Sequence, residues 1–488
     1  MFKKRQSRRE FFGAGAFGTA GIAAALADPS QAAAQAVGVK PADLPDLTIK
    51  EVKIYVTDLG DLRRLNGTET GEIVSIVTNS GHEGNYSIGN RSTTTGWLEW
   101  AKPVLVGKNV LDILPAITAT SGLKATYGYG AGGGRGGGGG RGAGGGGRGA
   151  GGAGAAGANA PGGGARGAGG GRGTGGAGGA GGGRGGAGAA GGGGGNQRGG
   201  GSWPNYYSAT AEIALWDILG RVVNRPVYKI LGGTKDRMMA YASSQHLATV
   251  EDYDPDIHRA IEEGYKGYKI HPGGGQHKDS ATEIPRYAGH MDEIRLCRKI
   301  AGENFMLAHD PVQQYNRYEA MKVGRLLDEL DYAWFEDPIR TTDLEGLVEL
   351  NKALDLPLHV GEFLMSIADF AEYIKADALN VARLIADNVG GISGSMRVAM
   401  LADAFGLEST PHNWGNPYDL AVHFQLELAL PNAYWFEMPH PSSYVDRPWA
   451  RDKFRIDKSG YVVATAEPGL GVALDRGALD KMTKTINR

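Results

Sequence analysis

The chain has 488 residues, 82 of them glycine, and a formal net charge of −2 at pH 7. Its length allows two or three domains, and its single cysteine, Cys297, excludes a disulfide within the chain. Most of the excess glycine lies in one tract, so the average composition misdescribes the rest of the chain.

The first 36 residues have the pattern of an export signal. Three basic residues at 3–5 precede SRREFF at 7–12, a Gly/Ala run continues to about residue 27, and an Ala-x-Ala cleavage site follows at 34–36. The paired arginines resemble a twin-arginine signal. A membrane anchor is disfavoured because the run is short and rich in Gly and Ala. We therefore expect the twin-arginine export machinery as a partner and a periplasmic or otherwise exported location.

Strand patterns open the next region. Residues 47–59 (LTIKEVKIYVTDL) and 72–81 (EIVSIVTNSG) alternate and carry many β-branched side chains, which predicts two strands of a small sheet. Residues 81–90 (GHEGNYSIGN) follow as a polar loop, and residues 95–114 are mainly helical in pattern.

Residues 129–201 are almost purely Gly, Ala and Arg, a composition that cannot bury a core and predicts disorder. The seven arginines of this tract have no acidic residue among them. Apart from Tyr129 at its first position, the tract lacks the aromatic residues that stack on bases, so we expect no specific nucleic-acid partner. A passive insertion, or a weak contact with anionic surfaces such as the envelope, is the favoured interpretation.

Helical spacing returns at residues 210–233 (TAEIALWDILGRVVNRPVYKILGG), so the tract interrupts one domain between two of its helices. We expect this capping domain to comprise 47–128 and 202–233. A return of the chain at about 440–488 completes it, with the strand-like pieces KFRID and GYVVAT and a terminal helix-like run.

A catalytic barrel is predicted at 236–439. DRMMAYAS (236–243) and YKGYKIH (265–271) predict its first two strands, with a helix at 254–263 between them. Six later apolar runs each end in a side chain capable of chemistry: Asp310, Glu336, Glu362, Asp387, His412 and Glu437. The steps between them are 26, 26, 25, 25 and 25 residues, about the length of one strand, one helix and two loops. Such residues at successive strand ends are typical of the catalytic end of a β/α barrel.

Asp310, Glu336 and Glu362 are carboxylates that close three successive strands. A single acid of this kind is commonly a helix N-cap or a surface charge, but three in register after apolar runs favour a metal site. Hard oxygen ligands from neighbouring strands predict Mg²⁺. The metal would bind a substrate carboxylate and stabilise the enediolate formed when the α-proton leaves.

Proton-transfer candidates lie on both sides of this predicted metal site. His412, in TPHNWG, ends the seventh strand and is predicted to be a general acid or base. Lys269 and His271 are two residues apart on the second strand and therefore share a face. Groups on opposite sides can remove a proton on one face of the substrate and deliver a proton, or protonate a leaving hydroxyl, on the other.

Several motifs are highly specific as a set: AEIALWDILGR, PVYKILGG, YKIH, LAHD, WFEDPI, VGEF, NVGGISG, TPHNWG and WFEMP. With them the chain resembles the enolase superfamily, and within it the mandelate racemase/muconate lactonizing enzyme-like, mandelate-racemase-like branch. The resemblance covers roughly 47–128 and 202–470. It implies an α/β fold, with an α+β capping domain over a modified (β/α)7β TIM-type barrel, and commonly a homo-oligomer.

The resemblance also implies roles for individual residues. Mg²⁺ would lie on Asp310, Glu336 and Glu362, and the reaction would begin with proton abstraction α to a carboxylate. His412 would be an acid or base, and Glu437 an electrophilic hydrogen-bonding partner of the substrate carboxylate.

Two departures from the branch concern proton transfer. The branch has Lys-x-Lys on the second strand, where this chain has Lys269-Ile270-His271, so His271 is the candidate for the missing base. The branch also places an Asp five residues before the Gly-Gly of the sixth strand, where this chain has Ile385. Asp387, two residues later, is on the same face by strand alternation and is the predicted partner of His412. The alternative is that Asp387 caps the next helix.

The sequence favours a Mg²⁺-dependent lyase that dehydrates an acid sugar or a related small α-hydroxy carboxylate. Racemisation, epimerisation or cycloisomerisation of such a substrate stays open because these reactions share the enolate step. A different class is a non-catalytic envelope-binding protein that uses the Gly/Arg tract. In the capping domain, His82, Tyr86 and Trp97 are candidates for substrate binding, because they lie in or near the loop that closes over substrate in the family.

Overall fold

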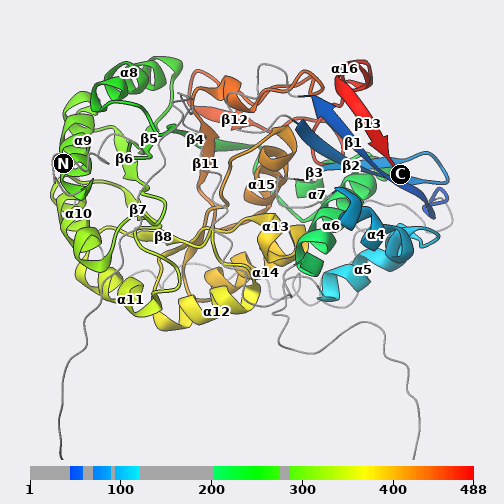
Figure 1. The fold of residues 1–488 in the computed structure, drawn as a ribbon, viewed down its shortest axis with the longest axis horizontal. Coiled ribbons are helices and arrows are strands. Elements are labelled where there is room, and N and C mark those ends of the chain that lie inside the picture. Colours follow the sequence, from blue (N-terminus) through cyan, green and yellow to red (C-terminus); the bar gives the residue numbers. More distant parts are fainter. Residues whose placement is uncertain (1–43, 59–69, 89–93, 121–202, 274–285) are drawn as a thin grey trace, which may run out of the picture. The chain divides into compact units, whose positions relative to one another are not determined.

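The computed structural model describes residues 44–58, 70–88, 94–120, 203–273 and 286–488 (Figure 1). The predicted export signal at 1–36 and the Gly/Arg-rich insertion at 129–201 lie outside these residues. Within the described ranges, no helix is both long enough and apolar enough to cross a bilayer.

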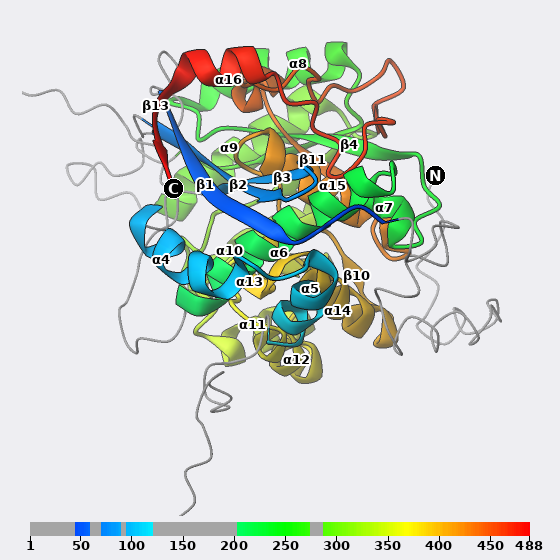
Figure 2. The same ribbon diagram turned by 90° about the vertical axis from the view of Figure 1, so that its right-hand side faces the viewer.

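An antiparallel sheet forms the centre of the capping domain. It contains β1 (Ile49–Asp58), β2 (Thr70–Thr78), β3 (Glu83–Ile88) and β13 (Thr483–Asn487), in the order β13-β1-β2-β3. Figure 2 shows β13, at the end of the chain, lying against β1. The terminal helix-like run is therefore only partly helical: α16 (Arg476–Met482) gives way to a strand that covers the edge of β1.

The predicted loop at 81–90 is wrong in the part that forms β3. This strand pairs with β2, with Tyr86 opposite Val74. Gly84, which resembles loop punctuation in the sequence, has a packing role: a Cβ atom there would lie 2.0 Å from the carbonyl oxygen of Ala214. Glycine is thus needed because the helix that contains Ala214 packs directly on the strand.

Four helices complete the described part of the capping domain: α4 (Thr94–Leu105), α5 (Val110–Thr120), α6 (Trp203–Val222) and α7 (Val227–Ile230). The helix predicted at 95–114 is therefore two helices. Gly107, with φ of 80°, lies between them, and this left-handed conformation ends the first helix.

The second sheet is parallel along its main path. Its strands are β4 (Arg237–Ser243), β5 (Gly267–Ile270), β6 (Met306–His309), β7 (Trp334–Glu336), β8 (Leu358–Val360), β9 (Val381–Ala382), β10 (Glu408–Ser409) and β11 (Trp435–Pro439). The order is β10-β9-β8-β7-β6-β5-β4-β11, and β12 (Tyr461–Val463) pairs antiparallel with β4. Between the two ends of this path, a backbone hydrogen bond of 3.0 Å runs from Ser409 N to Asn432 O, just before β11.

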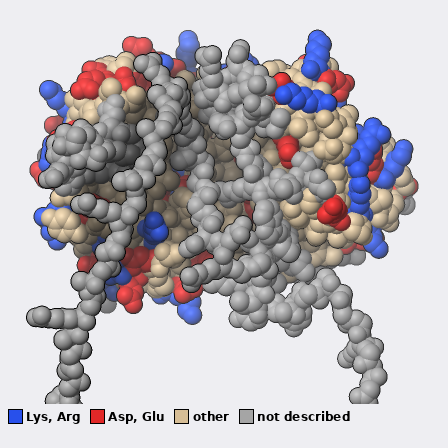
Figure 3. All heavy atoms as spheres, viewed as in Figure 1, with Lys and Arg blue, Asp and Glu red and all other residues tan. Residues whose placement is uncertain are grey.

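Helices alternate with these strands around the sheet (Figure 1). They are α8 (Tyr253–Glu263), α9 (Arg286–Ala301), α10 (Arg317–Glu329), α11 (Leu344–Ala353), α12 (Ile367–Ala376), α13 (Ala386–Val389), α14 (Gly391–Ala404) and α15 (Pro417–Ala429). In α8, Ile257 and Ala260 are buried while Asp254 and Glu262 are exposed. Figure 3 shows acidic side chains gathered over this helix, as expected for an amphipathic helix covering a barrel.

Strand alternation places the catalytic end of the barrel. Tyr241 of β4 and Trp334 of β7 point to each other, with ring centroids 5.1 Å apart. Two residues further along the same strands stand Ser243 and Glu336, which share the inward face one layer closer to the carboxyl ends. This topology confirms the predicted α/β fold, a TIM-type barrel with a capping domain.

Candidate metal and proton-transfer site

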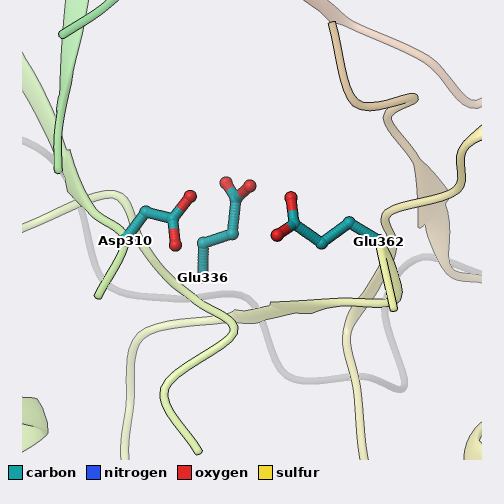
Figure 4. A group of neighbouring side chains, drawn as sticks. All are labelled: Asp310, Glu336 and Glu362. Carbon is teal, nitrogen blue, oxygen red and sulfur yellow. The ribbon is translucent and has the colours of Figure 1, made fainter. Parts of the chain in front are cut away.

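The three carboxylates predicted as metal ligands come together at the carboxyl ends of neighbouring strands. Asp310 directly follows β6, Glu336 ends β7, and Glu362 follows β8 by two residues. One oxygen from each lies within 4.8 Å of the others. Figure 4 shows the three side chains pointing toward one another, and all three are buried.

Two buried basic side chains enter this group of carboxylates. Lys269 Nζ lies 3.0 Å from Asp310 Oδ2 and 2.8 Å from Glu336 Oε1. It also lies 2.8 Å from Glu437 Oε1, so three carboxylates share the three protons of one ammonium. Arg383, immediately after β9, donates from Nε to Glu336 and from Nη2 to Glu437. Both basic side chains are fully buried.

Burial and neighbouring charges divide the ligands into two kinds. Burial favours the neutral form of Asp310, but Lys269 and His271 overcome this effect and hold the pKa of Asp310 well below its usual value. Burial and the surrounding carboxylates instead raise the pKa of Glu362 well above its usual value. Burial also raises the pKa of Glu336, against the opposing effects of Arg383 and Lys269, so Asp310 is the ligand of the three whose pKa is lowered.

The donor set of this cluster fits a hard divalent cation. Counted as ionised, its four carboxylates exceed its two basic groups by two charges; the members are Asp310, Glu336, Glu362, Glu437, Lys269 and Arg383. The three convergent ligands offer only oxygen atoms. A cluster of oxygen donors with a net charge of −2 matches the charge and the ligand preference of one hard divalent cation.

His412 lies beside the third ligand. Its Nε2 is 3.0 Å from Glu362 Oε2, and its backbone N–H donates to the Leu384 carbonyl at 2.9 Å. Burial, with Arg383 and Lys269 nearby, lowers the pKa of His412 well below its usual value. The raised pKa of Glu362 points the same way, so the contact is a neutral carboxyl–imidazole hydrogen bond rather than an ion pair.

Asp387 is not on a strand. It lies in the first turn of α13, whose N-cap is the extended residue Ile385, so the alternation argument that placed it on the face of Ile385 is wrong. Its Oδ2 accepts a hydrogen bond of 3.1 Å from the hydroxyl of Tyr86. The pairing of Asp387 with His412 stays a prediction.

His271 has a neighbour that the sequence analysis did not single out. His271 Nδ1 lies 2.7 Å from the Ser244 carbonyl, and His246 Nδ1 lies 2.8 Å from the Pro272 carbonyl. The two rings are 5.3 Å apart. Because a carbonyl only accepts, both Nδ1 atoms carry protons, and each Nε2 is left as the atom for proton exchange. Nε2 of His271 lies 3.1 Å from Asp310 Oδ2.

Glu437 receives hydrogen bonds on both of its carboxylate oxygens. Its oxygens accept from five donors: Ser243 Oγ, Lys269 Nζ, Trp414 Nε1, Asn413 N and Arg383 Nη2. Although burial opposes ionisation, Arg383 and Lys269 hold the pKa of Glu437 well below its usual value. The electrophilic role that the resemblance implies for Glu437 stays a prediction.

The three capping-domain candidates have different positions. Tyr86 of β3 reaches the carboxyl end of the barrel through Asp387. His82 lies in the turn before β3, where Nδ1 is 3.0 Å from Ser80 Oγ, and four strand positions separate it from Tyr86, roughly 13 Å. Trp97 is fully buried on α4 and donates to the carbonyl of Tyr207, 3.2 Å away. Only Tyr86 is brought to the site, because His82 and Trp97 serve the turn and the helix packing.

Arg383 and His246 are the residues that sequence reasoning missed. Arg383 lies in the run RLIAD, where a basic residue inside an otherwise apolar strand end was the available signal. His246 follows the first strand in SSQHL and carried no spacing signal, because the regular steps of 25 or 26 residues begin only at the third strand.

Residues 253–478 match the family described as Enolase C-terminal domain-like. The chain is 27% identical over 273 residues to arabinonate dehydratase of Saccharolobus solfataricus. This alignment covers 55% of this chain and 70% of that protein. It is 28% identical over 289 residues to D-gluconate dehydratase of Thermoproteus tenax, covering 57% of this chain and 57% of that protein. The second alignment thus spans less than two thirds of the relative.

Solved structures share the fold over most of the chain. D-glucarate dehydratase from Agrobacterium tumefaciens, complexed with magnesium, has a TM-score of 0.65 at 20% identity and covers 90% of this chain and 100% of that one. The 3,6-anhydro-D-galactonate cycloisomerase from Zobellia galactanivorans has a TM-score of 0.63 at 19% identity, with coverage of 90% and 100%. At these identities the likeness concerns the fold.

Proposed function

Taking the match of residues 253–478 to the Enolase C-terminal domain-like family as the premise, we propose that this chain is a Mg²⁺-dependent lyase. It abstracts the proton α to a carboxylate and dehydrates an acid sugar or a related α-hydroxy acid. One observation carries the proposal: an all-oxygen triad flanked by two histidines, with His271 Nε2 against Asp310 and His412 Nε2 against Glu362.

The substrate class is supported by the relatives. Arabinonate dehydratase and D-gluconate dehydratase are named for sugar acids, and the structural neighbour D-glucarate dehydratase is complexed with magnesium. A polyhydroxy carboxylate suits a site of this kind, because its carboxylate needs a cation and its leaving hydroxyl needs a proton donor.

Asp310, Glu336 and Glu362 would hold the Mg²⁺, which would supply Lewis-acid stabilisation of the charge that develops on the substrate carboxylate. The protein's own groups move the protons. His412 is neutral because burial lowers its pKa, so it is the base that removes the α-proton. His271 donates its Nδ1 proton in a hydrogen bond to the Ser244 carbonyl oxygen.

His271 is the acid in this scheme. Its Nε2 lies 3.1 Å from Asp310 Oδ2, so this atom faces the three carboxylates. From this position Nε2 can deliver a proton to the leaving hydroxyl. The two histidines therefore take separate roles on opposite sides of the three carboxylates.

Incubation in D₂O with a panel of aldonic and aldaric acids tests the reaction. We expect a 2-keto-3-deoxy acid to form from at least one of them, and His412→Asn to abolish its formation. His258→Asn is the matched control, because this histidine is 60% exposed on α8, and its activity should equal that of the unmodified protein. Deuterium in recovered substrate with no keto product would refute dehydration.

That last result would favour the second candidate, racemisation or epimerisation. The observation that favours it is the same pair of histidines, since two groups on opposite sides can also remove and return a proton at one carbon. A non-catalytic envelope-binding role would instead require Glu336→Gln to leave the cellular role intact while deletion of 129–201 abolished it.

Export rests on the sequence of residues 1–36 and is part of the proposal. We expect the protein in the periplasmic fraction, and we expect replacement of Arg8 and Arg9 by lysine to retain it in the cytoplasm. Equal fractionation of the two forms would contradict the twin-arginine route.

A further inference from the structure

Among the described residues, two side chains contact both a proposed metal ligand and Glu437: those of Lys269 and Arg383. Arg383 differs from Lys269 in the number of groups that it reaches. It is fully buried and stands immediately after β9. Its Nε donates to Glu336 and its Nη2 to Glu437. Its Nη1 donates to two backbone carbonyls, those of Pro411 at 3.0 Å and Thr410 at 3.4 Å.

These carbonyls give the guanidinium a second connection. Pro411 directly precedes His412, so Arg383 holds the segment that carries the proposed base. β10 and β11 are the two ends of the sheet path and do not pair with each other as strands. Arg383 therefore bridges this side of the barrel. Its Nη1 binds the backbone that follows β10, and its Nη2 binds Glu437 on β11.

Glu437 completes the bridge from the opposite side. The backbone N–H of Asn413 donates to its Oε2 at 2.8 Å, and Arg383 donates to the same oxygen. The segment from Thr410 to Asn413 is thus held at its carbonyls by the guanidinium and at an N–H by the carboxylate. A lysine could supply the charge of Arg383, but it lacks the planar fork that reaches several acceptors at once.

We propose that Arg383 is a positioning residue that fixes the orientation of the ligand Glu336 and, through Glu437 and the Pro411 carbonyl, the position of His412. The metal site and the base are then set by one side chain. This inference rests on the proposed function in taking Glu336 to be a metal ligand and His412 to be the base.

Arg298 offers a matched control for the removal of the Arg383 side chain. It also donates from its guanidinium to several carbonyls, those of Leu330, Gly302, Phe305 and Asp331, but at the opposite end of the barrel strands. Arg298→Met removes a comparable set of hydrogen bonds without touching Glu336. A merely structural role for Arg383 predicts that Arg383→Met and Arg298→Met behave alike.

The experiment is a metal titration of the full chain, with Mg²⁺ by calorimetry and with Mn²⁺ by electron paramagnetic resonance. Loss of a group that orients a metal ligand typically weakens binding by 10–100-fold. We expect Arg383→Met to weaken binding at least about tenfold and to change the Mn²⁺ spectrum, and we expect Arg298→Met to leave both unchanged. Equal or tighter binding by Arg383→Met would overturn the inference.

Arg383→Lys covers the case in which the methionine variant does not fold. It keeps the charge and loses the fork, so we expect weaker binding than in the unmodified protein and an altered Mn²⁺ spectrum. Identity with the unmodified protein in both readouts would show that charge alone matters and would overturn positioning. If the unmodified protein binds neither ion, the proposed function fails first, which separates the two failures.

Discussion

Replacing Glu293 with glutamine should make the protein more stable at neutral and alkaline pH. Glu293 lies on α9, and its Oε2 accepts a hydrogen bond of 3.3 Å from the backbone N–H of Gly273, two residues after His271. Its Oε1 is buried without a hydrogen-bond partner among the described residues. Burial raises the pKa of Glu293 to about 8, against 4.5 for an ordinary glutamate.

The sign of the effect follows from this upward shift. A carboxyl whose pKa is higher in the folded than in the unfolded state contributes fully below pH 4.5, and its contribution is lost as the pH rises toward 8. The raised pKa costs about 3 kcal/mol at pH 7, where the folded carboxyl keeps its proton, and about 5 kcal/mol at pH 9, where the buried carboxyl is mostly ionised. Glutamine resembles the protonated acid and carries no such penalty.

Denaturant unfolding at pH 5, 7 and 9 measures the difference. Between pH 5 and pH 9 the gain in unfolding free energy of Glu293→Gln over the unmodified protein should grow by about 4 kcal/mol. Asp292→Asn is the control on the same helix, because Asp292 is 79% exposed and its replacement should leave the pH dependence unchanged. A constant difference across the pH range would refute the reasoning.

Three further predictions concern the metal, the capping domain and the helix core. Mg²⁺ at a hundredfold excess over its dissociation constant should raise the unfolding free energy by about 2.7 kcal/mol, and Glu362→Gln should reduce this gain in calorimetric scans. Tyr86→Phe should destabilise the protein by about 1 kcal/mol in denaturant unfolding, because it removes the hydrogen bond to Asp387. If it raised KM without loss of stability, Tyr86 would be a substrate contact instead. Trp97→Ala should cost about 3 to 5 kcal/mol and leave KM unchanged, since the ring is fully buried on α4.

The metal triad was predictable because two simple rules govern it. A strand–helix unit has a nearly constant length, so acids spaced 26 residues apart fall at the ends of adjacent strands. Strand alternation then decides which side chain faces inward. His309, one residue before Asp310, turns away and stacks on Tyr315 at an interplanar angle of 11°, while Asp310 enters the site.

The proton-transfer groups escaped the same rules. Asp387 kept the 25-residue spacing, but the strand ends at Ala382 and a helix begins at Ala386, so alternation no longer applies where Asp387 stands. Glu437 is contacted by five donors that arrive from four separate segments of the chain. Spacing along a sequence cannot show such a convergence, since it is a property of the assembled barrel.

The two buried cations offset the mutual repulsion of the carboxylates in the triad. At a separation of 4.8 Å, two ionised carboxylates repel by about 3.5 kcal/mol at an effective dielectric constant of about 20, so an all-acid cluster would spread apart or take up protons. Lys269 contacts Asp310, Glu336 and Glu437 at 3.0 Å or less. At the same dielectric constant, the attraction in each of these contacts is larger than the repulsion between one pair of carboxylates. The raised pKa of Glu362, which neither cation contacts directly, removes a further charge. Chelation should therefore leave the protein folded with its carboxylates in place, whereas Lys269→Met should unfold it or disperse them even when Mg²⁺ is present.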